Sequence, residues 1–576
     1  MRLSRPTHRP HPGPARPARL PGLRLIGALI LLAGAGVGCF ADGGGGGGSS
    51  GKSARRAPTA VPALGNVVPA PSEVRPAGLP YEITAGTAIR FDDRPGVRAV
   101  GDYLAGILRP STGFELPLDP GPGADGIRLR LAPDEAALGD EGYRLESSPA
   151  AVTLVAKEPA GLFRGVQTLR QLLPHAIEKK AAGPGPWQVP GGTITDTPRY
   201  AYRGVMLDVA RHFFTVDQVK RYVDQAALYK INKLHLHLTD DQGWRIAIDS
   251  WPKLTTIGGA TEVGGGEGGF YTKEQFREIV AYAASRHMEV IPEIDMPGHT
   301  AAALAAYPEL NCDGVAKPVY TGTDVGFSTL CVGKPVTFDF VDDVVREIAA
   351  LTPGEYLHIG GDEADSTEEK DYRVFMDRVR ETVAKYGKKP IAWHQIAGAG
   401  VDGDVIAQYW GYGGTKKEER EQVADAVRRG ARLILSPADR IYLDMQYTAT
   451  HPLGLHWAGT VEVDESYDWD PGGYFAAEGV PEDAVVGIEA ALWTETLDTS
   501  AELEQMAFPR LLGAAEKGWS RGDIGWDDYQ PRLVAQAGRM AALGIAYHPS
   551  PAVDWPKART PPPSYRYGSR CTRTRP

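Results

Sequence analysis

Positive charge is scarce along most of this 576-residue chain, which has 62 Lys and Arg against 72 Asp and Glu and a formal net charge of −10. The two ends are the exception, because residues 1–24 hold six Arg and no acid, and residues 551–576 hold six basic residues against one Asp. Without these ends, residues 25–550 carry a net charge of −21. Binding to nucleic acid needs a basic surface, so this acidic body argues against a nucleic-acid partner.

Long apolar segments are scarce as well. Residues 25–38 (LIGALILLAGAGVG) are apolar or small, but this run is shorter than the roughly 20 residues that a membrane-spanning helix needs. It follows an Arg-rich segment, so we expect residues 1–38 to be a secretory signal peptide. Cys39 comes next, and the junction resembles a bacterial lipoprotein signal, in which the cysteine is lipidated. Two outcomes stay open, a secreted extracellular protein and one anchored to the outer face of the cell membrane by a lipid on Cys39.

Cysteine is the third scarce feature, with only four residues in the chain: Cys39, Cys312, Cys331 and Cys571. In an exported protein, Cys312 and Cys331 are close enough in sequence to bridge one loop, and we expect a disulfide there. The alternative is two buried free thiols.

Glycine and proline, in contrast, are abundant, with 69 and 46 residues. Residues 39–80 are Gly/Ser-rich and then Pro/Ala-rich, which is typical of a flexible tether. Residues 551–576 have scattered Arg and no apolar period, which is typical of a disordered basic tail. Between them, residues 81–197 predict a small α+β domain, with helices at 97–108 and 162–173, a strand at 127–131 and a hairpin of 142–146 with 151–156.

Residues 198–550 alternate strands with helices. The predicted strands are 203–207, 233–238, 289–294, 356–359, 390–393, 404–409, 432–435 and 485–490. Capping-box patterns at residues 215–218 (TVDQ) and 272–275 (TKEQ) begin two of the helices between them, and the crossover after residue 393 is short. The predicted fold class is therefore α/β, a (β/α)₈ TIM barrel preceded by the small α+β domain.

Barrels of this kind carry their chemistry at the C-terminal ends of the strands. The residues at and after the C-terminal ends of the predicted strands are unusually polar and aromatic, and they include Asp240, Asp295, His299, Asp362, Glu363, Trp393, Trp410, Tyr442, Asp444, Trp457, Trp493 and Glu495. Carboxyl groups and flat aromatic faces suit a sugar, because its C–H face packs on indole and a protonated carboxyl can expel the leaving group. The rim therefore predicts a glycosidase.

Four separate motifs carry a family resemblance. HIGGDE (358–363) resembles the signature of glycoside hydrolase family 20, the β-N-acetylhexosaminidases, and LHLHLTDDQGWR (234–245), PEIDMPGH (292–299) and LWTET (492–496) match as well. The resemblance runs from about residue 75 to 548 and is greatest to the secreted actinobacterial enzymes.

The resemblance implies a retaining exo-enzyme that removes terminal β-linked GlcNAc or GalNAc with the substrate's own acetamido group as nucleophile, through an oxazolinium ion. Glu363 is then the general acid and base, Asp362 accepts the acetamido N–H, and Tyr442 donates to the acetamido oxygen. The partner is an N-acetylhexosamine-containing oligosaccharide or glycoconjugate, with no cofactor and no metal.

The remaining site residues follow from the same resemblance. It implies that Arg203 and Glu495 hold sugar hydroxyls, and that Asp444 makes a further sugar contact. The tryptophans wall the pocket, namely Trp393, Trp410 and Trp493, with Trp457 at its mouth. Asp240, Asp295 and His299 form a supporting polar network behind the two catalytic carboxyls.

Two other classes of function stay open. His235 and His237 form a His-x-His pair on a barrel strand, which also occurs in metal-dependent amidohydrolases and deacetylases of this fold. Strand alternation would turn both side chains inward, where hydrogen-bonded packing is the simpler interpretation. A sugar-binding protein without turnover is the third class, although such a protein has no need of a proton donor. The preference for GlcNAc or GalNAc and the natural polymer stay open too.

Overall fold

The computed structural model describes residues 63–556 except residues 402, 404 and 523. The predicted signal peptide, Cys39, the first part of the tether and most of the basic tail lie outside the described residues. Among the described residues, no helix is both long and apolar enough to cross a membrane.

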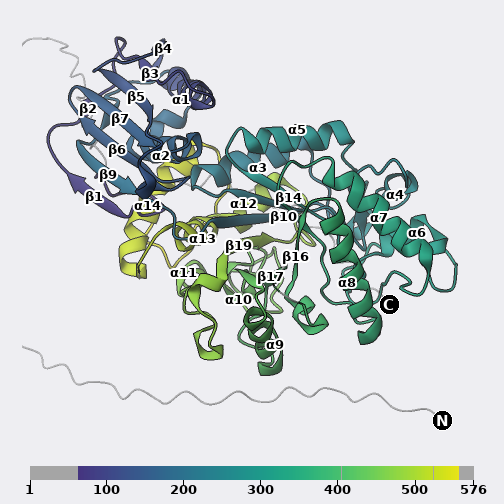
Figure 1. Ribbon diagram of the computed structural model, residues 1–576. Helices are drawn as coiled ribbons and strands as arrows, with labels where there is room; N and C mark the ends of the chain where they lie inside the picture. Colours follow the sequence, from purple (N-terminus) through teal and green to yellow (C-terminus); the bar gives the residue numbers. More distant parts are fainter. Residues whose placement is uncertain (1–62, 402, 404, 523, 557–576) are drawn as a thin grey trace, which may run out of the picture. The chain divides into compact units, whose positions relative to one another are not determined.

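A seven-stranded sheet organises the small domain, in the order β1-β9-β6-β7-β5-β3-β4 (Figure 1). Its strands are β1 (Glu73–Pro76), β3 (Ile89–Phe91), β4 (Leu118–Pro120), β5 (Gly126–Leu131), β6 (Tyr143–Ser148), β7 (Ala151–Ala156) and β9 (Gly192–Asp196), and a separate pair consists of β2 (Tyr81–Glu82) and β8 (Gln188–Val189). Helices α1 (Val97–Thr112) and α2 (Pro159–Leu172) pack against the sheet with their apolar faces. Short 3₁₀ turns complete the domain, η1 (Ala136–Leu138) and η2 (His175–Glu178). The predicted helices, strand and hairpin are all present.

The folded chain begins earlier than the sequence predicted. Residues 63–80, assigned to the tether, belong to the small domain, since Leu64 and Val68 are buried and β1 pairs antiparallel with β9. The amide of Val68 also donates to Oε1 of Gln171 in α2, at 2.8 Å. The Pro/Ala-rich composition of this segment is typical of a tether, but its few apolar residues are buried and its backbone pairs with the edge of the sheet.

Eight parallel strands close into a barrel after residue 200 (Figure 1). In barrel order they are β10 (Tyr202–Asp208), β11 (Lys233–His237), β14 (Glu289–Glu293), β15 (Tyr356–His358), β16 (Lys389–Trp393), β17 (Ile406–Tyr409), β18 (Arg432–Leu435) and β19 (Val485–Leu492). All eight predicted strands are present and shifted by at most a few residues at their ends. The predicted barrel, preceded by the small domain, is confirmed.

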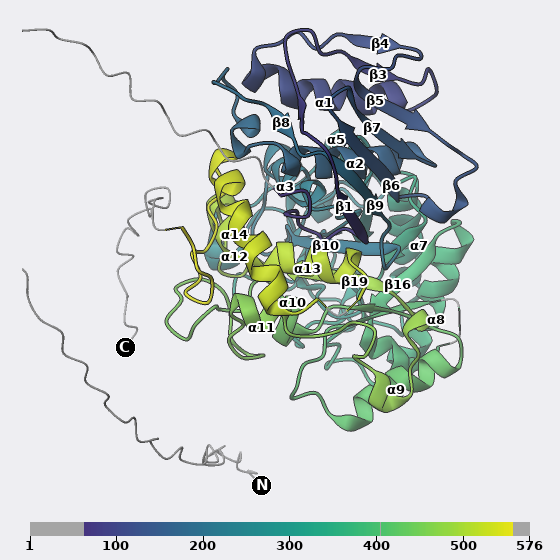
Figure 2. The ribbon, with the colours of Figure 1, turned by 90° about the vertical axis from the view of Figure 1, so that its left-hand side faces the viewer.

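Helices follow most of the barrel strands. The longer ones are α3 (Val216–Leu228), α5 (Lys273–Ala284), α7 (Pro335–Ala349), α8 (Glu369–Lys385), α9 (Lys417–Arg428), α12 (Ser500–Ala507), α13 (Arg510–Trp519) and α14 (Trp526–Ala542). Capping boxes begin α3 and α5, as predicted. Helix α13 contacts β10 and β19 and so covers the seam where the first and last strands meet (Figure 2).

Short elements build the loops of the barrel. They are the hairpin β12 (Thr239–Asp240) with β13 (Gly243–Trp244), the helices α4 (Lys253–Thr256), α6 (Ala301–Ala306), α10 (Ala438–Ile441) and α11 (Val463–Tyr467), and the 3₁₀ turns η3 (Val263–Gly265), η4 (Pro308–Leu310), η5 (His394–Ala399), η6 (Ala476–Glu478) and η7 (Glu482–Ala484). The crossover from β16 to β17 contains only η5, in agreement with its predicted shortness. Cys312 and Cys331 form the predicted disulfide.

Strand alternation separates the inside of the barrel from the layer beneath the helices. On β11, Leu234 and Leu236 belong to the main apolar core, whereas His235 and His237 face carboxylates of other barrel strands. A separate apolar cluster inside the barrel contains Tyr202, Ile291, Ile391, Ile406 and Ile434. The interior therefore combines an apolar layer with a fully buried polar set.

Candidate active site

A cavity of about 460 Å³ opens where the barrel strands end. The lining residues are Arg211, Asp240, Asp295, His299, Thr323, Val325, Asp362, Glu363, Trp410, Tyr412, Tyr442, Asp444, Leu455, Trp457, Trp493 and Glu495. They come from the segments that follow at least six of the eight strands, which is where this fold concentrates polar function. Eleven of the residues predicted from the sequence lie together in this cavity.

The loop after β15 places Asp362 and Glu363 side by side. Gly360 and Gly361 have φ of 63° and 97°, and Glu363 itself has a φ of 44°, which a residue with a side chain adopts at an energetic cost. A Cβ on Gly360 would lie 1.7 Å from Oδ1 of Asp295, so only glycine fits there. The amide of Gly361 donates to that same oxygen at 3.1 Å. This backbone turns both carboxyls toward the cavity.

The two neighbouring carboxyls lie in different surroundings. The side chain of Asp362 is only 10% exposed, whereas that of Glu363 is 34% exposed. Burial raises the pKa of Asp362 to about 6, although His299 opposes this shift, while Glu363 adds to it. A buried acceptor beside a more exposed carboxyl suits a division of labour between orientation and proton transfer.

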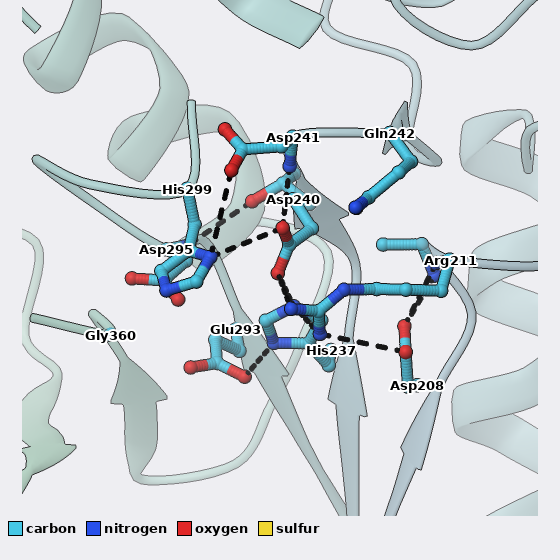
Figure 3. Close-up of polar contacts among 12 residues, drawn as sticks. Asp208, Arg211, His237, Asp240, Asp241, Gln242, Glu293, Asp295, His299 and Gly360 are labelled. Atoms are coloured by element: carbon cyan, nitrogen blue, oxygen red, sulfur yellow. Dashed lines mark hydrogen bonds and ion pairs between the residues drawn. The ribbon is translucent and has the colours of Figure 1, made fainter. Parts of the chain in front are cut away.

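His299 lies beside the carboxyls of Asp362 and Glu363 and belongs to a polar network, and Figure 3 shows its contacts with Asp240 and Asp241. Its Nε2 lies 3.4 Å from Oε2 of Glu363 and 3.8 Å from Oδ2 of Asp362, and its Nδ1 lies 3.2 Å from Oδ1 of Asp240. Burial opposes a charge on His299, but Asp240, Asp362 and Asp295 together raise its pKa well above the ordinary value. The predicted supporting network of Asp240, Asp295 and His299 therefore lies directly beside the carboxyls of Asp362 and Glu363.

Aromatic side chains form much of the rest of the wall. Trp457 is 44% exposed, and its ring meets the rings of Trp410 and Tyr442 nearly edge-on, at centroid distances of 5.7 and 6.0 Å. Burial, with Asp362 and Asp444 nearby, raises the pKa of Tyr442 well above its ordinary value. Its hydroxyl therefore keeps its proton at neutral pH and can act as a donor.

Trp393 takes a different place from the one predicted. It is fully buried and does not line the cavity, but its ring lies 5.8 Å from that of Trp493. Trp393 therefore backs the wall that Trp493 presents to the cavity.

Asp444 and Glu495 lie on the same side as Trp493. The Oδ1 of Asp444 accepts the backbone N–H of Trp493 at 3.5 Å, and its Oδ2 has no partner among the described residues. Burial raises the pKa of both carboxyls, and for Asp444 the neighbouring Glu495 adds to the shift. Both groups can therefore exchange hydrogen bonds with hydroxyl groups that enter the cavity.

Arg203 does not bind in this cavity, so that prediction is wrong. It lies near the start of β10, fully buried, and its guanidinium donates to Glu141 of the small domain and to the backbone oxygens of Tyr200 and Lys230. The start of β10 is the opposite end of the strand from the cavity. Arg203 therefore joins the barrel to the small domain.

Arg211 is the arginine of the cavity, and it is not among the site residues predicted from the sequence. It lies three residues beyond the end of β10, with Nη2 2.8 Å from Oδ2 of Asp240 and its guanidinium carbon 4.8 Å from the ring centre of Trp493. Its Nε has no partner among the described residues. The positional rule for barrels favours Arg211, because it follows a strand end, whereas Arg203 lies within the strand.

The His-x-His pair of β11 lies among buried carboxylates, and the groups His235, Glu293, His358 and His237, Glu293, Asp295 are each close enough together to hold a metal ion. Both ring nitrogens of His235 and both of His237 lie 2.5–2.9 Å from carboxylate oxygens. Three of these contacts are hydrogen bonds, whereas Nε2 of His235 has no hydrogen-bond partner among the described residues. Packing inside the barrel through hydrogen bonds, the simpler interpretation, is what the geometry supports.

Comparison with known proteins agrees with this geometry. The model of the family 20 glycosyl hydrolase catalytic domain matches residues 200–373 and 365–522, and the model of domain 2 of that family matches residues 65–197. The chain belongs to glycoside hydrolase family 20. This family 20 glycoside hydrolase is 43% identical over 482 residues to a β-N-acetylhexosaminidase of Cellulomonas fimi, an alignment that covers 83% of this chain and 95% of that protein.

Solved structures of relatives share the fold of this glycoside hydrolase. The family 20 β-N-acetylhexosaminidase of Streptomyces coelicolor A3(2) is 63% identical, with a TM-score of 0.84 over 86% of this chain and 99% of that chain. The N-acetyl-β-hexosaminidase of Streptomyces plicatus in complex with Thio-NAglucal is also 63% identical, with a TM-score of 0.85 over 87% and 99%. A mutant of the Streptomyces plicatus enzyme is known in complex with its product GlcNAc, at a TM-score of 0.84 over 87% of this chain and all of that one.

Proposed function

We propose that this chain is a retaining exo-β-N-acetylhexosaminidase that removes terminal, non-reducing β-linked GlcNAc or GalNAc. The observation that carries the proposal is the pair Asp362 and Glu363, which a left-handed turn of the backbone presents to one cavity opposite Tyr442. The GlcNAc product complex of the Streptomyces plicatus enzyme supports an N-acetylhexosamine as the sugar.

In this proposal the substrate supplies the nucleophile. Glu363 protonates the departing glycosidic oxygen while the 2-acetamido oxygen attacks the anomeric carbon, which gives an oxazolinium ion and a free aglycone alcohol. Ionised Asp362 accepts the acetamido N–H and stabilises its developing positive charge, and the hydroxyl of Tyr442 donates to the acetamido oxygen. Glu363, now a carboxylate, then takes a proton from the water that opens the ion. Two inversions give net retention.

Other groups bind the sugar in its reactive position. Arg211 supplies a charged partner for the ring hydroxyls, and hydrogen bonds to a charged group are stronger than neutral ones. Asp444 and Glu495 add carboxyl groups that can bond to the same hydroxyls. Trp493 presents an indole surface to the C–H face of the pyranose. Trp457, at the exposed edge, would contact the aglycone side.

The test is hydrolysis of matched chromogenic β-glycosides of GlcNAc, GalNAc and glucose. We expect turnover of the two acetamido sugars and none of the glucoside, which lacks the internal nucleophile. A thiazoline mimic of the oxazolinium ion should inhibit, whereas a covalent sugar–enzyme adduct would contradict the mechanism. Full loss of activity with EDTA, restored by zinc, would favour a metal-dependent hydrolase instead.

We also propose that the enzyme is exported, either free or anchored through a lipid on Cys39. The basic and apolar pattern of residues 1–38 supports export, and a Cys312–Cys331 disulfide suits an oxidising compartment. Mass spectrometry of the mature N-terminus distinguishes the outcomes: a lipid-modified Cys39 indicates anchoring, an unmodified cleaved N-terminus free secretion, and an uncleaved chain contradicts export.

A further inference from the structure

A buried row of alternating imidazole and carboxylate groups leads from the candidate active site into the barrel, and Figure 3 shows its first members, His299, Asp240, His237 and Glu293. Behind His299 and Asp240 come His237, Glu293, His235 and Glu489, all fully or almost fully buried. The mechanism proposed above uses none of these last four groups. Their charges are nevertheless close to the reacting carboxyls, so their protonation states bear on the reaction.

His237 occupies the middle of this row, with a carboxylate on each side. Its Nδ1 lies 2.5 Å from Oε2 of Glu293, and its Nε2 lies 2.8 Å from Oδ2 of Asp240. An ionised carboxylate only accepts hydrogen bonds, so each ring nitrogen must carry a proton to bond with it. A neutral imidazole would turn one nitrogen lone pair against a carboxylate oxygen.

Glu293 accepts a hydrogen bond from His237, and two further imidazoles lie close to its carboxylate. Its Oε2 also faces Nε2 of His235 at 2.9 Å, and its Oε1 faces Nδ1 of His358 at 2.8 Å. Burial favours a neutral Glu293, but His358, His237 and His235 hold its pKa well below the ordinary value. Glu293 is therefore an ionised acceptor on the far side of His237.

Asp240 is surrounded in the same way. Its Oδ2 lies 2.8 Å from Nη2 of Arg211, and its Oδ1 accepts the backbone N–H of Asp241 at 2.6 Å and faces Nδ1 of His299 at 3.2 Å. Because Arg211 and His237 approach the same oxygen, Nη1 of Arg211 comes within 3.5 Å of Nε2 of His237. Two cations therefore converge on one face of Asp240.

We propose, on the basis of the function proposed above, that His237 is a positioning residue that carries a permanent positive charge. This imidazolium holds Asp240 ionised. As a result, His299 donates Nδ1–H to Asp240 and turns Nε2 toward Glu363. No proton passes through His237 during turnover. Its charge fixes the orientation of the next imidazole, and His299 can then stabilise Glu363 once that group has given up its proton to the leaving group.

The charge of His237 also reaches Asp362 and Asp295, whose pKa values it lowers, whereas Glu293 raises them. The ionisable groups that face His237 are Glu293, Asp240 and Arg211, with Asp295 and His299 just beyond them. Removing the charge of His237 alone should make Asp362 harder to ionise. Removing Glu293 together with His237 removes one charge of each sign and should largely cancel that change.

The direct test needs no substitution. Neutron diffraction from deuterated crystals of the full-length protein near pH 8, above the ordinary His pKa of about 6.5, shows which ring nitrogens carry deuterium. We expect deuterium on both nitrogens of His237 and on only one nitrogen of His358, because burial lowers the pKa of His358. A single deuterium on His237 would overturn the proposal. This result does not depend on hexosaminidase activity, so it separates the proposal from the proposed function.

The functional test compares pH profiles of kcat/KM. We expect His237→Gln to move the acid limb about one pH unit higher, and the double variant His237→Gln/Glu293→Gln to move it back toward the wild type. His358→Gln is the matched control, because His358 also lies against Glu293, but burial lowers the pKa of its imidazole, in contrast to the raised pKa of His237. If the role of His237 were purely structural, all three variants would yield less folded protein and the acid limb would stay in place. That result would contradict the proposal.

Discussion

Arg203 donates from Nη2 to the carboxylate of Glu141 at 2.7 Å, which joins the first barrel strand to the small domain. Arg164 in α2 shares the same carboxylate at 2.9 Å. Burial alone would raise the pKa of Glu141, but the two arginines lower it from 4.5 to about 2. Ionised Glu141 therefore stabilises the folded protein at neutral pH.

We expect Glu141→Gln to lower the free energy of unfolding by about 3–5 kcal/mol, because it leaves two buried guanidinium groups without their counter-charge. The pKa of Glu141 is lower in the folded than in the unfolded chain, so its stabilisation is complete above about pH 4.5 and is lost as the pH falls toward 2. The Tm of the wild type should therefore fall more steeply below about pH 5 than that of the variant. Thermal unfolding over this range checks this, and equal slopes would contradict it.

Arg211→Lys and Arg203→Lys form a matched pair that separates binding from stability. Replacing Arg211 should lower kcat/KM about ten- to a hundredfold, because a point charge cannot reproduce a guanidinium that meets Asp240 and a sugar together. Replacing Arg203 should lower Tm and leave KM unchanged. Steady-state kinetics and thermal unfolding of both variants check this. A raised KM in Arg203→Lys would restore the role that the sequence first indicated.

Glu363→Gln should lower kcat by about 10²–10⁴-fold, since general acid–base catalysis contributes on this scale. The side chain is 34% exposed, so the substitution should leave Tm nearly unchanged. A substrate with a good phenolate leaving group needs less protonation and should lose less activity than an alkyl glycoside. Equal losses for both kinds of leaving group would contradict the acid role.

Asp362 should set the acid limb of the pH profile. Burial raises its pKa to about 6, and only the ionised form can stabilise the positive acetamido group, so kcat/KM should fall as the pH drops below about 6. In Asp362→Asn this limb should disappear and the rate at neutral pH should fall. A variant that keeps the same acid limb would show that another group controls it.

The sequence predicted the barrel well because its signals are local. Each strand is a short apolar run, and the capping boxes at Thr215 and Thr272 depend only on residues three positions apart. The order of strands followed from the simple alternation of this fold. The same local reasoning failed for residues 63–80, because Val68 is held by Gln171, in a helix about a hundred residues away along the chain.

Side-chain roles were harder to predict than elements. Arg203 and Arg211 lie at opposite ends of one strand, and only the pairing partners of each, Glu141 and Asp240, distinguish a structural from a binding arginine. Trp393 is likewise at a strand end, as the last residue of β16, yet its ring lies behind Trp493. Such differences depend on packing across the barrel, so they cannot be predicted from the sequence of any single strand.

The loop closed by Cys312 and Cys331 gives a last prediction. Thr323 and Val325 of this loop line the cavity, so the disulfide restrains part of the wall. Changing both cysteines to serine should lower the free energy of unfolding by about 3 kcal/mol, as expected for a loop of this length, and should raise KM more than it changes kcat.

Two comparisons test this effect of the loop. Reduced wild-type enzyme should match the double-serine variant in both Tm and KM, because each lacks the same covalent bond, and reductant should leave the variant unchanged. The loop has other attachments, since Ser328 donates to Asp241 at 2.5 Å and Ser366 donates to the backbone oxygen of Gly326 at 2.7 Å. These bonds should keep the loop near the cavity, so the variant should retain turnover. Unchanged KM together with a lower Tm would show that the disulfide stabilises the fold without shaping the sugar site.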